Sequence, residues 1–475
     1  MPYLHICMLS ILVAVTIFHL LFPDFVQFSQ ALKWDGENYI YYTLQFPQVA
    51  FGQTLNMYHF QRILPSGIIY YSAKLLGIPL TAPKVFYAFV GLNILLIFIS
   101  FCIWLQICRQ LALSSKGKLL GFTGLFVNFA LLKMPFYYPV LTDVMAFTLG
   151  MSLLYFYLKR NSAGVLITGL IGAFTFPTVF YSSLLLFAFP MEQPKPVSPG
   201  SYSLWNKWLA LLTAFGLLLL IGVFIFYRQV PLINPNTPAV LILSIAAVIA
   251  YFYLVGKAFY KAELYLQAIR SFNTSGRGFI ALGIFSVLYI IIFWGAGHEP
   301  SPLNYKGFLA NIVVSAIANP FTFLVSHAVY VGPVLLVLLY FIRFFIEEIY
   351  RYGLGLHLFV LGYVLLSINS ETRLFINAWP FFVAFLCKSL EKTNLPSGFY
   401  ILLLLCSLAL SKFWYRIDLA YFSANYLDFP EQKYFMSIGP WMSDAMYMLQ
   451  GGIMLLLYFW MYWLYFRNLK ASSLK

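Results

Sequence analysis

A few carboxylates and arginines at polar positions are the side chains in this chain that could do chemistry. Asp35 follows Trp34 in a polar loop, Asp143 follows a Tyr-Tyr-Pro turn, and Arg373 ends a Glu-Thr-Arg triplet. Only 9% of the residues are charged, and charges kept at the ends of apolar segments usually serve a function. A carboxylate could take a proton from an attacking hydroxyl group, and an arginine could stabilise a departing phosphate.

Asp35 is the first candidate, as a general base or as a carboxylate that holds a metal. Its neighbours Trp34 and Tyr39 are candidate substrate-binding residues that could stack against a sugar, and Gly36 would allow close approach of the backbone. Asp143 is the second catalytic candidate and could orient the acceptor or share a metal. An equally good reading makes Asp143 a cap of the helix that follows it.

Arg62, Lys133 and Arg373 are the candidate ligands of a donor phosphate. Arginine suits this role because its planar fork can donate two parallel hydrogen bonds to a phosphate. The alternative for Arg373 is a pair with Glu371, itself a candidate substrate-binding residue, which requires a loop because positions i and i+2 of a helix do not face each other. Lys133 could instead extend to the lipid headgroups.

The histidines could bind a divalent metal, which is the one cofactor that the sequence allows as a possibility. No other cofactor is expected. His59 would share a helix face with Arg62 and is a candidate substrate-binding residue. Together with His298, His327 and Asp35 it could compose a metal site, but no His-Glu-x-x-His spacing is present. The identity of any metal is left unknown.

The elements that must position these side chains are apolar. The 475 residues are 62% hydrophobic, with a mean hydropathy of +0.83, and apolar runs of about 17–25 residues can only be satisfied as membrane-spanning helices. The sequence therefore predicts an all-α, polytopic transmembrane helix bundle with roughly 12–14 spans. The five cysteines fall within or at the ends of apolar segments, which argues against a disulfide framework.

Lysine and arginine bias predicts the orientation of the bundle. With both termini cytoplasmic, the inner segments carry 18 of the 29 Lys and Arg residues but only 5 of the 15 Asp and Glu residues. This is the positive-inside pattern. The bases are scattered and form no stripe, so nucleic acid is not an expected partner, whereas anionic membrane lipids are. The inner segments are 109–118, 159–162, 191–207, 257–277, 343–353, 388–398 and 467–475.

Two membrane modules are expected, with no soluble domain and no internal repeat. Residues 1–190 form the first module, which begins with a retained span at 3–22, and residues 191–475 form a variable second module. Apolar stretches too short to cross, at 66–76 and 310–318, predict helices that lie at the membrane interface. A helical pair is expected to turn near 175–178, where Pro177 interrupts an apolar stretch. The predicted outer loops are 23–83, 134–143, 295–333 and 416–450.

The order and common sidedness of these features resemble the GT-C superfamily of integral-membrane glycosyltransferases. The resemblance is carried by Asp35 in the first outer loop, Arg62-Ile63-Leu64-Pro65 before an interfacial helix, Thr142-Asp143, and Glu371-Thr372-Arg373 before a span. It implies transfer of a sugar from a polyprenyl-phosphate donor to an acceptor glycan, lipid or protein on the extracytoplasmic face. The bacterial inner membrane is the preferred location, with the endoplasmic reticulum as the alternative.

Three other functions would use a similar chain. A transporter or flippase of a lipid-linked substrate also needs many spans and a cavity, but usually has repeated halves with helices broken near mid-membrane. A polysaccharide polymerase or ligase would rely on outer-loop arginines without the early carboxylate. A non-catalytic membrane scaffold would give Asp35 no purpose. The charges cluster at one edge, which favours an enzyme.

Overall fold

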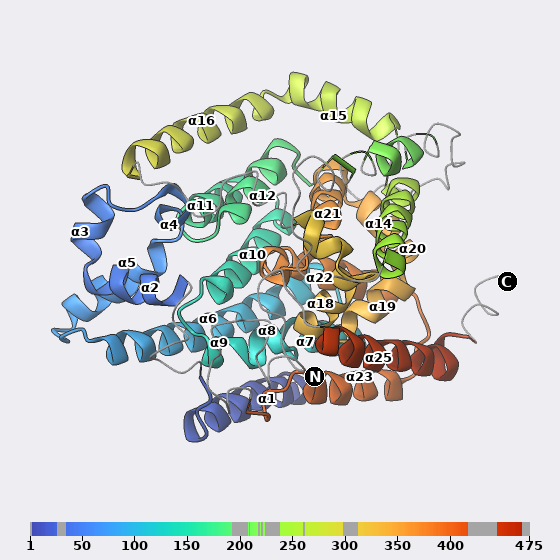
Figure 1. Ribbon diagram of the computed structural model, residues 1–475, viewed down its shortest axis with the longest axis horizontal. Helices are drawn as coiled ribbons and strands as arrows, with labels where there is room; N and C mark the ends of the chain where they lie inside the picture. Colours follow the sequence, from blue (N-terminus) through green and yellow to red (C-terminus); the bar gives the residue numbers. More distant parts are fainter. Residues whose placement is uncertain are drawn as a thin grey trace.

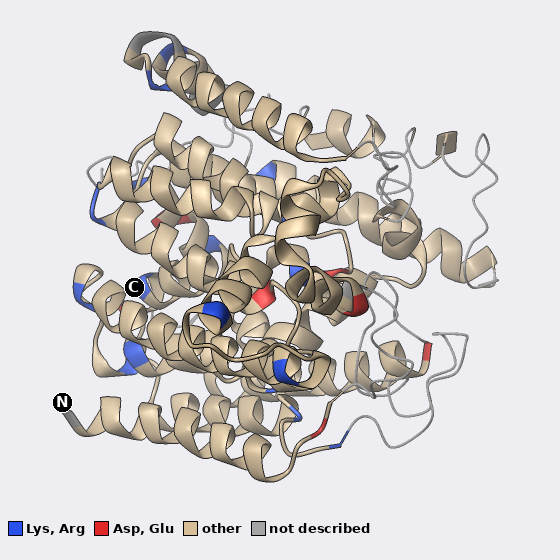
Figure 2. Ribbon diagram, turned by 90° about the vertical axis from the view of Figure 1, so that its left-hand side faces the viewer, with Lys and Arg blue, Asp and Glu red and all other residues tan. Residues whose placement is uncertain are grey.

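The computed structural model describes residues 2–25, 35–191, 238–259, 262–297, 312–416 and 444–467, with a few positions between 208 and 223. Helices are connected by short loops, and these ranges contain no β-strand. The predicted all-α class is confirmed at this level. Figure 2 shows long stretches of helix without a charged residue, as expected for a membrane-type bundle.

Five of the described helices are long and apolar enough to cross a membrane. An α-helix rises about 1.5 Å per residue, so about 20 residues match a hydrocarbon core of about 30 Å. A sixth span results if two helices bent by 65° are counted together, α7 (Ser115–Phe126) and the segment Phe129–Tyr137. The five are α1 (Pro2–Leu21), α6 (Ala82–Gln110), α14 (Pro238–Phe259), α16 (Arg277–Gly295) and α25 (Asp444–Met461).

Shorter apolar helices account for much of the difference from the expected 12–14 spans. Each has 10–17 residues, which is less than a perpendicular crossing requires. They are α10 (Asp143–Leu158), α11 (Ser162–Ala173), α12 (Pro177–Ala188), α18 (Thr322–Val331), α21 (Leu354–Leu366), α22 (Trp379–Leu390) and α23 (Ser397–Leu410).

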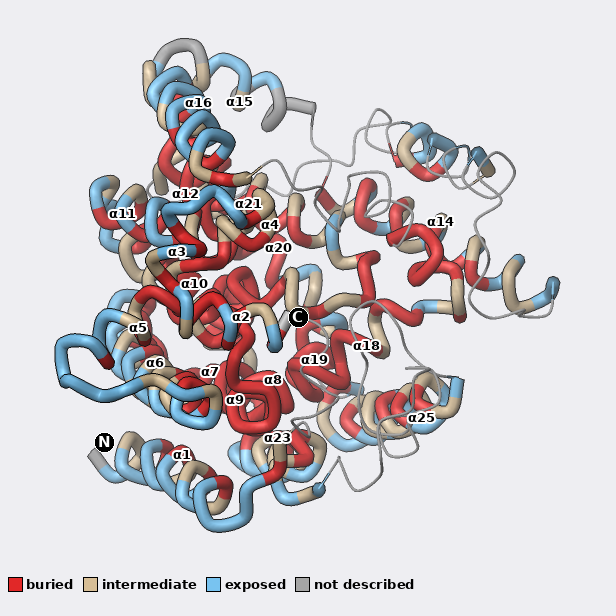
Figure 3. Tube along the Cα trace, turned by 60° about the vertical axis from the view of Figure 1, so that its left-hand side comes forward, coloured by how far each residue is buried: buried red, intermediate tan, exposed pale blue. Residues whose placement is uncertain are grey.

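The most buried helices lie at the centre of the bundle, and the longest lie around it. Figures 1 and 3 show α7, α8 (Phe129–Leu132) and α9 (Met134–Tyr137) in the interior, with α1, α16 and α25 at the periphery. Glycines allow close helix packing there. A Cβ atom on Gly121 of α7 would lie 1.9 Å from the Trp104 ring, and one on Gly150 of α10 would lie 2.1 Å from the carbonyl oxygen of Asn377.

The predicted first outer loop is itself helical. It contains α2 (Asp35–Leu44), α3 (Phe46–Phe51), α4 (Met57–Phe60) and α5 (Leu64–Leu75), at the left of Figure 1. Helix α5 corresponds to the short apolar stretch 66–76. In the other predicted interfacial stretch, residues 312–317 are helical, and residues 310–311 lie outside the described ranges.

A helical pair forms where Pro177 interrupts the apolar stretch, as expected. Helix α11 ends at Ala173 and α12 begins at Pro177, with residues 174–176 as the turn. The two helices pack along each other, with Ser183 Oγ donating to the Val165 carbonyl at 2.7 Å. The remaining helices of the second half are α15 (Ala262–Ser275), α19 (Val334–Tyr340) and α20 (Ile342–Arg351).

Loops predicted to share a side of the membrane contact one another. On the basic side, the Ser114 backbone N–H donates to Glu391 at 3.0 Å, and Lys116 donates to the Leu395 carbonyl at 2.8 Å. On the other side, Asn319 donates to Asp444 at 2.9 Å. Each of these contacts joins two loops that were predicted to lie on the same side, and the cytoplasmic location of the basic side stays a prediction from the charge bias.

Candidate functional site

Asp143 and Arg373 form an ion pair across 230 residues of sequence. Asp143 is the first residue of α10, and Arg373 lies in a short 3-10 helix, η1 (Thr372–Phe375). The Arg373 Nε–H group lies 2.9 and 3.1 Å from the two carboxylate oxygens of Asp143. Only 11% of the Asp143 side chain and 19% of the Arg373 side chain is exposed. Burial strengthens such a pair because little water competes for either charge.

Glu371 makes Arg373 the centre of a three-residue charge cluster. Its Oε1 atom lies 3.8 Å from Nη1 of Arg373. Glu371 has a non-helical backbone immediately before η1, which provides the loop that a pair of positions i and i+2 requires. The capping interpretation of Asp143 has less support, because its carboxylate is directed to Arg373. Thr142, at the N-cap position, makes no side-chain capping hydrogen bond.

The start of α2 lies beside the loop that leads to Asp143. Asp35 is the first residue of α2, and the backbone N–H of Gly36 donates to the Tyr138 hydroxyl at 2.9 Å. The Asn93 side chain fixes the same loop by donating to the carbonyl oxygens of Pro135 at 3.1 Å and Pro139 at 2.9 Å. The structure thus brings the backbone of the first candidate carboxylate close to the loop of the second. Trp34 lies outside the described residues.

Tyr39 and His59 belong to a buried aromatic cluster beneath the start of α2. The His59 ring lies edge-on to the rings of Tyr39, Tyr42 and Tyr58, with centroids 6.4, 5.4 and 5.0 Å away. Both Tyr39 and His59 are buried. This packing fixes α4 against α2, with His59 among three tyrosine rings.

Arg62 connects the first outer loop with the α11–α12 turn. Its guanidinium carbon lies 3.8 Å from the centre of the Tyr58 ring and 5.7 Å from that of Phe176. Its Nη1 also donates to the Tyr58 carbonyl at 3.0 Å. Two residues later, the backbone N–H of Leu64 donates to the Phe174 carbonyl at 2.9 Å.

A buried hydrogen-bond network joins the same turn to the segment after Arg373. Thr178 Oγ1 donates to Asn377 Oδ1 at 3.0 Å, and Asn377 Nδ2 donates to the Tyr363 hydroxyl at 2.6 Å. Sequence reasoning gave no role to Asn93 or Asn377. A single amide within or next to an apolar run would have been the signal, because buried amides need partners.

Lys133 is held in a different place from the other two candidate cations. Its ammonium group donates to Asp24 at 2.5 Å and to the Tyr415 carbonyl at 2.8 Å. Both charged side chains are almost completely buried, at 1% exposed for Lys133 and 4% for Asp24. Through these two contacts Lys133, between α8 and α9, holds the loop after α1 and the loop after α23, so it has a clear structural role.

No metal centre is evident in the described part of the chain, which contains no group of three or more His, Cys, Asp or Glu side chains placed to hold an ion. His327 is buried, and its ring nitrogens lie 2.9 Å from Thr372 Oγ1 and 2.7 Å from the Ser367 carbonyl. His327 therefore supports the segment that carries Arg373. His298 lies outside the described ranges.

A cavity of about 740 Å³ begins next to this segment and continues along the bundle. Its lining includes His327, Ser367 and Phe375, and also Lys257 and Arg343. Most of its wall is apolar, including Leu335, Leu338, Ile342, Ile346, Trp379 and Phe382. Cavities of about 300–1,000 Å³ with mainly apolar walls are typical of binding sites for organic molecules.

No protein-family model matches the chain, and no curated protein or solved structure matches it. The class of the protein therefore rests on its own composition and architecture. It is an all-α membrane-type helix bundle, with several long apolar helices around a buried centre.

Proposed function

We propose that this protein is a GT-C-like membrane glycosyltransferase with 12–14 membrane crossings. It would move a sugar from a polyprenyl-phosphate donor to an acceptor on the extracytoplasmic face. One observation carries the proposal: Asp143 pairs with Arg373, and the loop that leads to Asp143 contacts the start of α2, where Asp35 lies. The proposal places the carboxylate of Asp35 in the same site as this ion pair, because the Gly36 backbone next to it contacts the loop that precedes Asp143.

Each group has a defined part in the transfer. An acceptor hydroxyl oxygen attacks the anomeric carbon of the donor sugar, and the bond between that carbon and the phosphate oxygen breaks. The hydroxyl proton goes to Asp35, acting as general base, and the bonding electrons leave with the polyprenyl phosphate. Arg373 would stabilise the negative charge that develops on the phosphate, and Asp143 and Glu371 orient its guanidinium group.

The apolar cavity supports a substrate with a long hydrocarbon chain. It reaches Phe375, two positions after Arg373, so a lipid chain inside it would place its phosphate end near the charge cluster. The proposal assigns Arg62 to the same side through its contacts with the α11–α12 turn. Lys133 is left out because Asp24 and the Tyr415 carbonyl occupy its ammonium group.

The test is transfer of labelled sugar from a polyprenyl-phosphate donor by the purified full-length protein. Asp35→Asn keeps the shape of the side chain and removes its charge, and we expect transfer to fall by about 10²–10⁴-fold, the usual contribution of a general base. Arg373→Lys keeps the charge but loses the planar fork, and donor binding should weaken. Near-normal turnover by Asp35→Asn would remove Asp35 as the base.

Two further measurements distinguish the transferase from a transporter and test for a metal. Movement of the labelled donor across a vesicle membrane without transfer of its sugar would identify a transporter or flippase instead. Addition of a chelator tests the metal, because a metal-held carboxylate would lose activity and regain it when a divalent ion is restored.

A further inference from the structure

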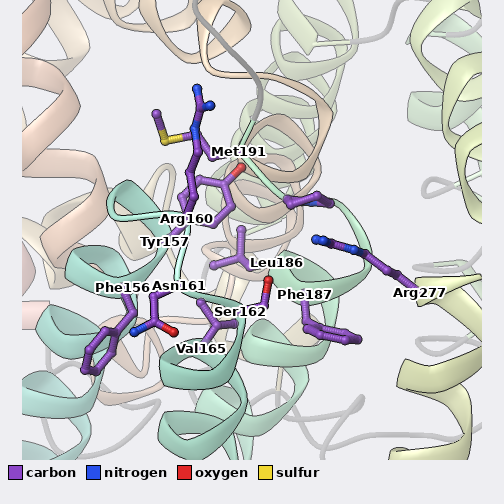
Figure 4. A pocket seen from close by; sticks show the side chains of 11 residues that line it. Phe156, Tyr157, Arg160, Asn161, Ser162, Val165, Leu186, Phe187, Met191 and Arg277 are labelled. Carbon is purple, nitrogen blue, oxygen red and sulfur yellow. The ribbon is translucent and has the colours of Figure 1, made fainter. Parts of the chain in front are cut away.

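A second, smaller pocket lies on the basic side of the bundle. Its volume is about 210 Å³, and it lies between the loop after α10, the end of α12 and the first residue of α16. Figure 4 shows Arg277 extending toward it from α16, with Arg160 at another edge next to Met191. Neither Arg160 nor Arg277 belongs to the proposed transferase site, so a separate role is open for this pocket.

Positive charge dominates the pocket. Arg160 and Arg277 both line it, and none of the described residues of its lining is acidic. Within the described ranges, neither arginine has an ion-pair partner. The nearest acid along the chain from Met191 is Glu192, which lies outside those ranges. Two arginines from separate elements that line one pocket are suited to bind an anion.

Local helix energetics do not explain why arginine occupies either position. Arg160 follows the end of α10 with a φ of +55°, a left-handed conformation that favours glycine. The turn is closed by backbone hydrogen bonds of 2.9 Å from Arg160 to Tyr157 and from Asn161 to Phe156, an arrangement in which glycine is the usual residue. Arg277 is the first residue of α16, where the helix dipole disfavours a cation. Positive-inside bias alone would be met by an arginine elsewhere in these loops.

The rest of the lining fits a phosphate that carries an apolar substituent. Asn161 and Ser162 are polar, and Asn161 Oδ1 accepts from the Gly164 backbone N–H at 2.9 Å, which orders the first turn of α11. Val165, Leu186 and Phe187 form an apolar wall, and the Arg277 guanidinium carbon lies 6.0 Å from the Phe187 ring centre. The volume is below the range of about 300–1,000 Å³ typical of drug-sized ligands, so a small group is expected to fill it.

We propose that this pocket binds the phosphate group of a phosphate monoester, with Arg160 and Arg277 as its two cationic ligands. Basic pockets between membrane helices on the cytoplasmic side are suited to anionic lipid headgroups. An anionic phospholipid of the adjacent leaflet and a soluble phosphate offer the same chemistry. The experiment therefore compares the two sources.

The experiment measures binding of phosphatidic acid to the full-length protein in neutral detergent, by the shift of its thermal unfolding. Arg160→Gly suits the backbone at that position and should not unfold the protein. Arg277→Gln removes a cation from a helix N-terminus, which also favours folding. Each variant should raise the dissociation constant about tenfold, the loss expected for one charged hydrogen-bond donor.

Lys159→Gln is the matched control. It removes the same charge from the residue next to Arg160, and Lys159 does not line the pocket. Its dissociation constant should stay within about twofold of the native value, as expected for an exposed charge. An equal loss in all three variants, or no binding by the native protein, would overturn the proposal.

Measurements with inorganic phosphate and with lipid vesicles distinguish a soluble phosphate from a membrane phospholipid as the ligand. If inorganic phosphate alone stabilises the native protein and Arg277→Gln raises its dissociation constant about tenfold, the ligand is a soluble phosphate. If stabilisation requires phosphatidic acid in phosphatidylcholine vesicles and phosphate does not compete, the ligand is the lipid. Stabilisation by phosphatidylcholine alone that is equal in the native protein and both arginine variants would contradict the assignment.

Discussion

The ion pair between Asp143 and Arg373 makes a quantitative prediction about how the candidate site is held together. Removing one partner of a fully buried pair costs about 3–5 kcal/mol, and an exposed pair contributes at most about 1 kcal/mol. The two side chains here are 11% and 19% exposed, with contacts of 2.9 and 3.1 Å. We therefore expect Asp143→Ala or Arg373→Met to lower the free energy of unfolding by about 2–3 kcal/mol each.

A double-mutant cycle isolates the pair from other effects. Asp143 also lies in the first turn of α10, where an acid gains about 0.3–1 kcal/mol from the helix dipole. That contribution is lost in both the single and the double variant, so it cancels in the cycle. The coupling energy between Asp143→Ala and Arg373→Met should be about 2 kcal/mol, within the usual range for residues in contact.

Glu371 supplies the internal control for this cycle. Its carboxylate lies farther from Arg373, at 3.8 Å, and 26% of its side chain is exposed. The coupling between Glu371→Gln and Arg373→Met should therefore be below about 1 kcal/mol.

The assay is unfolding of the purified protein in mixed micelles as a denaturing detergent is added, followed by tryptophan fluorescence. The transitions must be reversible with equal slopes for the cycle to be valid. A coupling for Asp143 and Arg373 no larger than that for Glu371 and Arg373 would refute the idea that this pair joins α10 to the segment after α21. The proposed orientation of Arg373 would then fail with it.

Two further predictions concern the packing that supports the site. Gly150→Ala should destabilise the protein by about 1–3 kcal/mol, because the new methyl group would lie 2.1 Å from the Asn377 carbonyl oxygen. Gly362→Ala, in another helix with open space around the glycine, should instead stabilise it by about 0.5–1 kcal/mol; a similar thermal shift in both variants would refute the close approach. Lys133→Met should cost about 3–5 kcal/mol because it leaves the Asp24 carboxylate buried without its ammonium partner. Combining it with Asp24→Leu should restore much of that loss in the same unfolding assay, and a further additive loss would contradict the ion-pair role.

The class of the protein could be predicted from sequence because it depends on composition. Long apolar runs leave backbone groups no partner except within a helix, whatever the tertiary arrangement. The α11–α12 turn and the helix in 66–76 were equally predictable, since Pro177 interrupts one apolar stretch and Gly77 and Pro79 end the other.

Only the tertiary structure shows which residues the three candidate cations contact. Arg62, Lys133 and Arg373 looked alike in sequence, as isolated cations at the ends of apolar segments. The fold directs them to an aromatic stack, a buried Asp24 and Asp143, respectively. The helices next to them are largely apolar, so periodicity indicates little about which helix face meets which neighbour. Contacts across 109 and 230 residues arise from that packing, because close approach depends on small residues and shape, which no local pattern encodes.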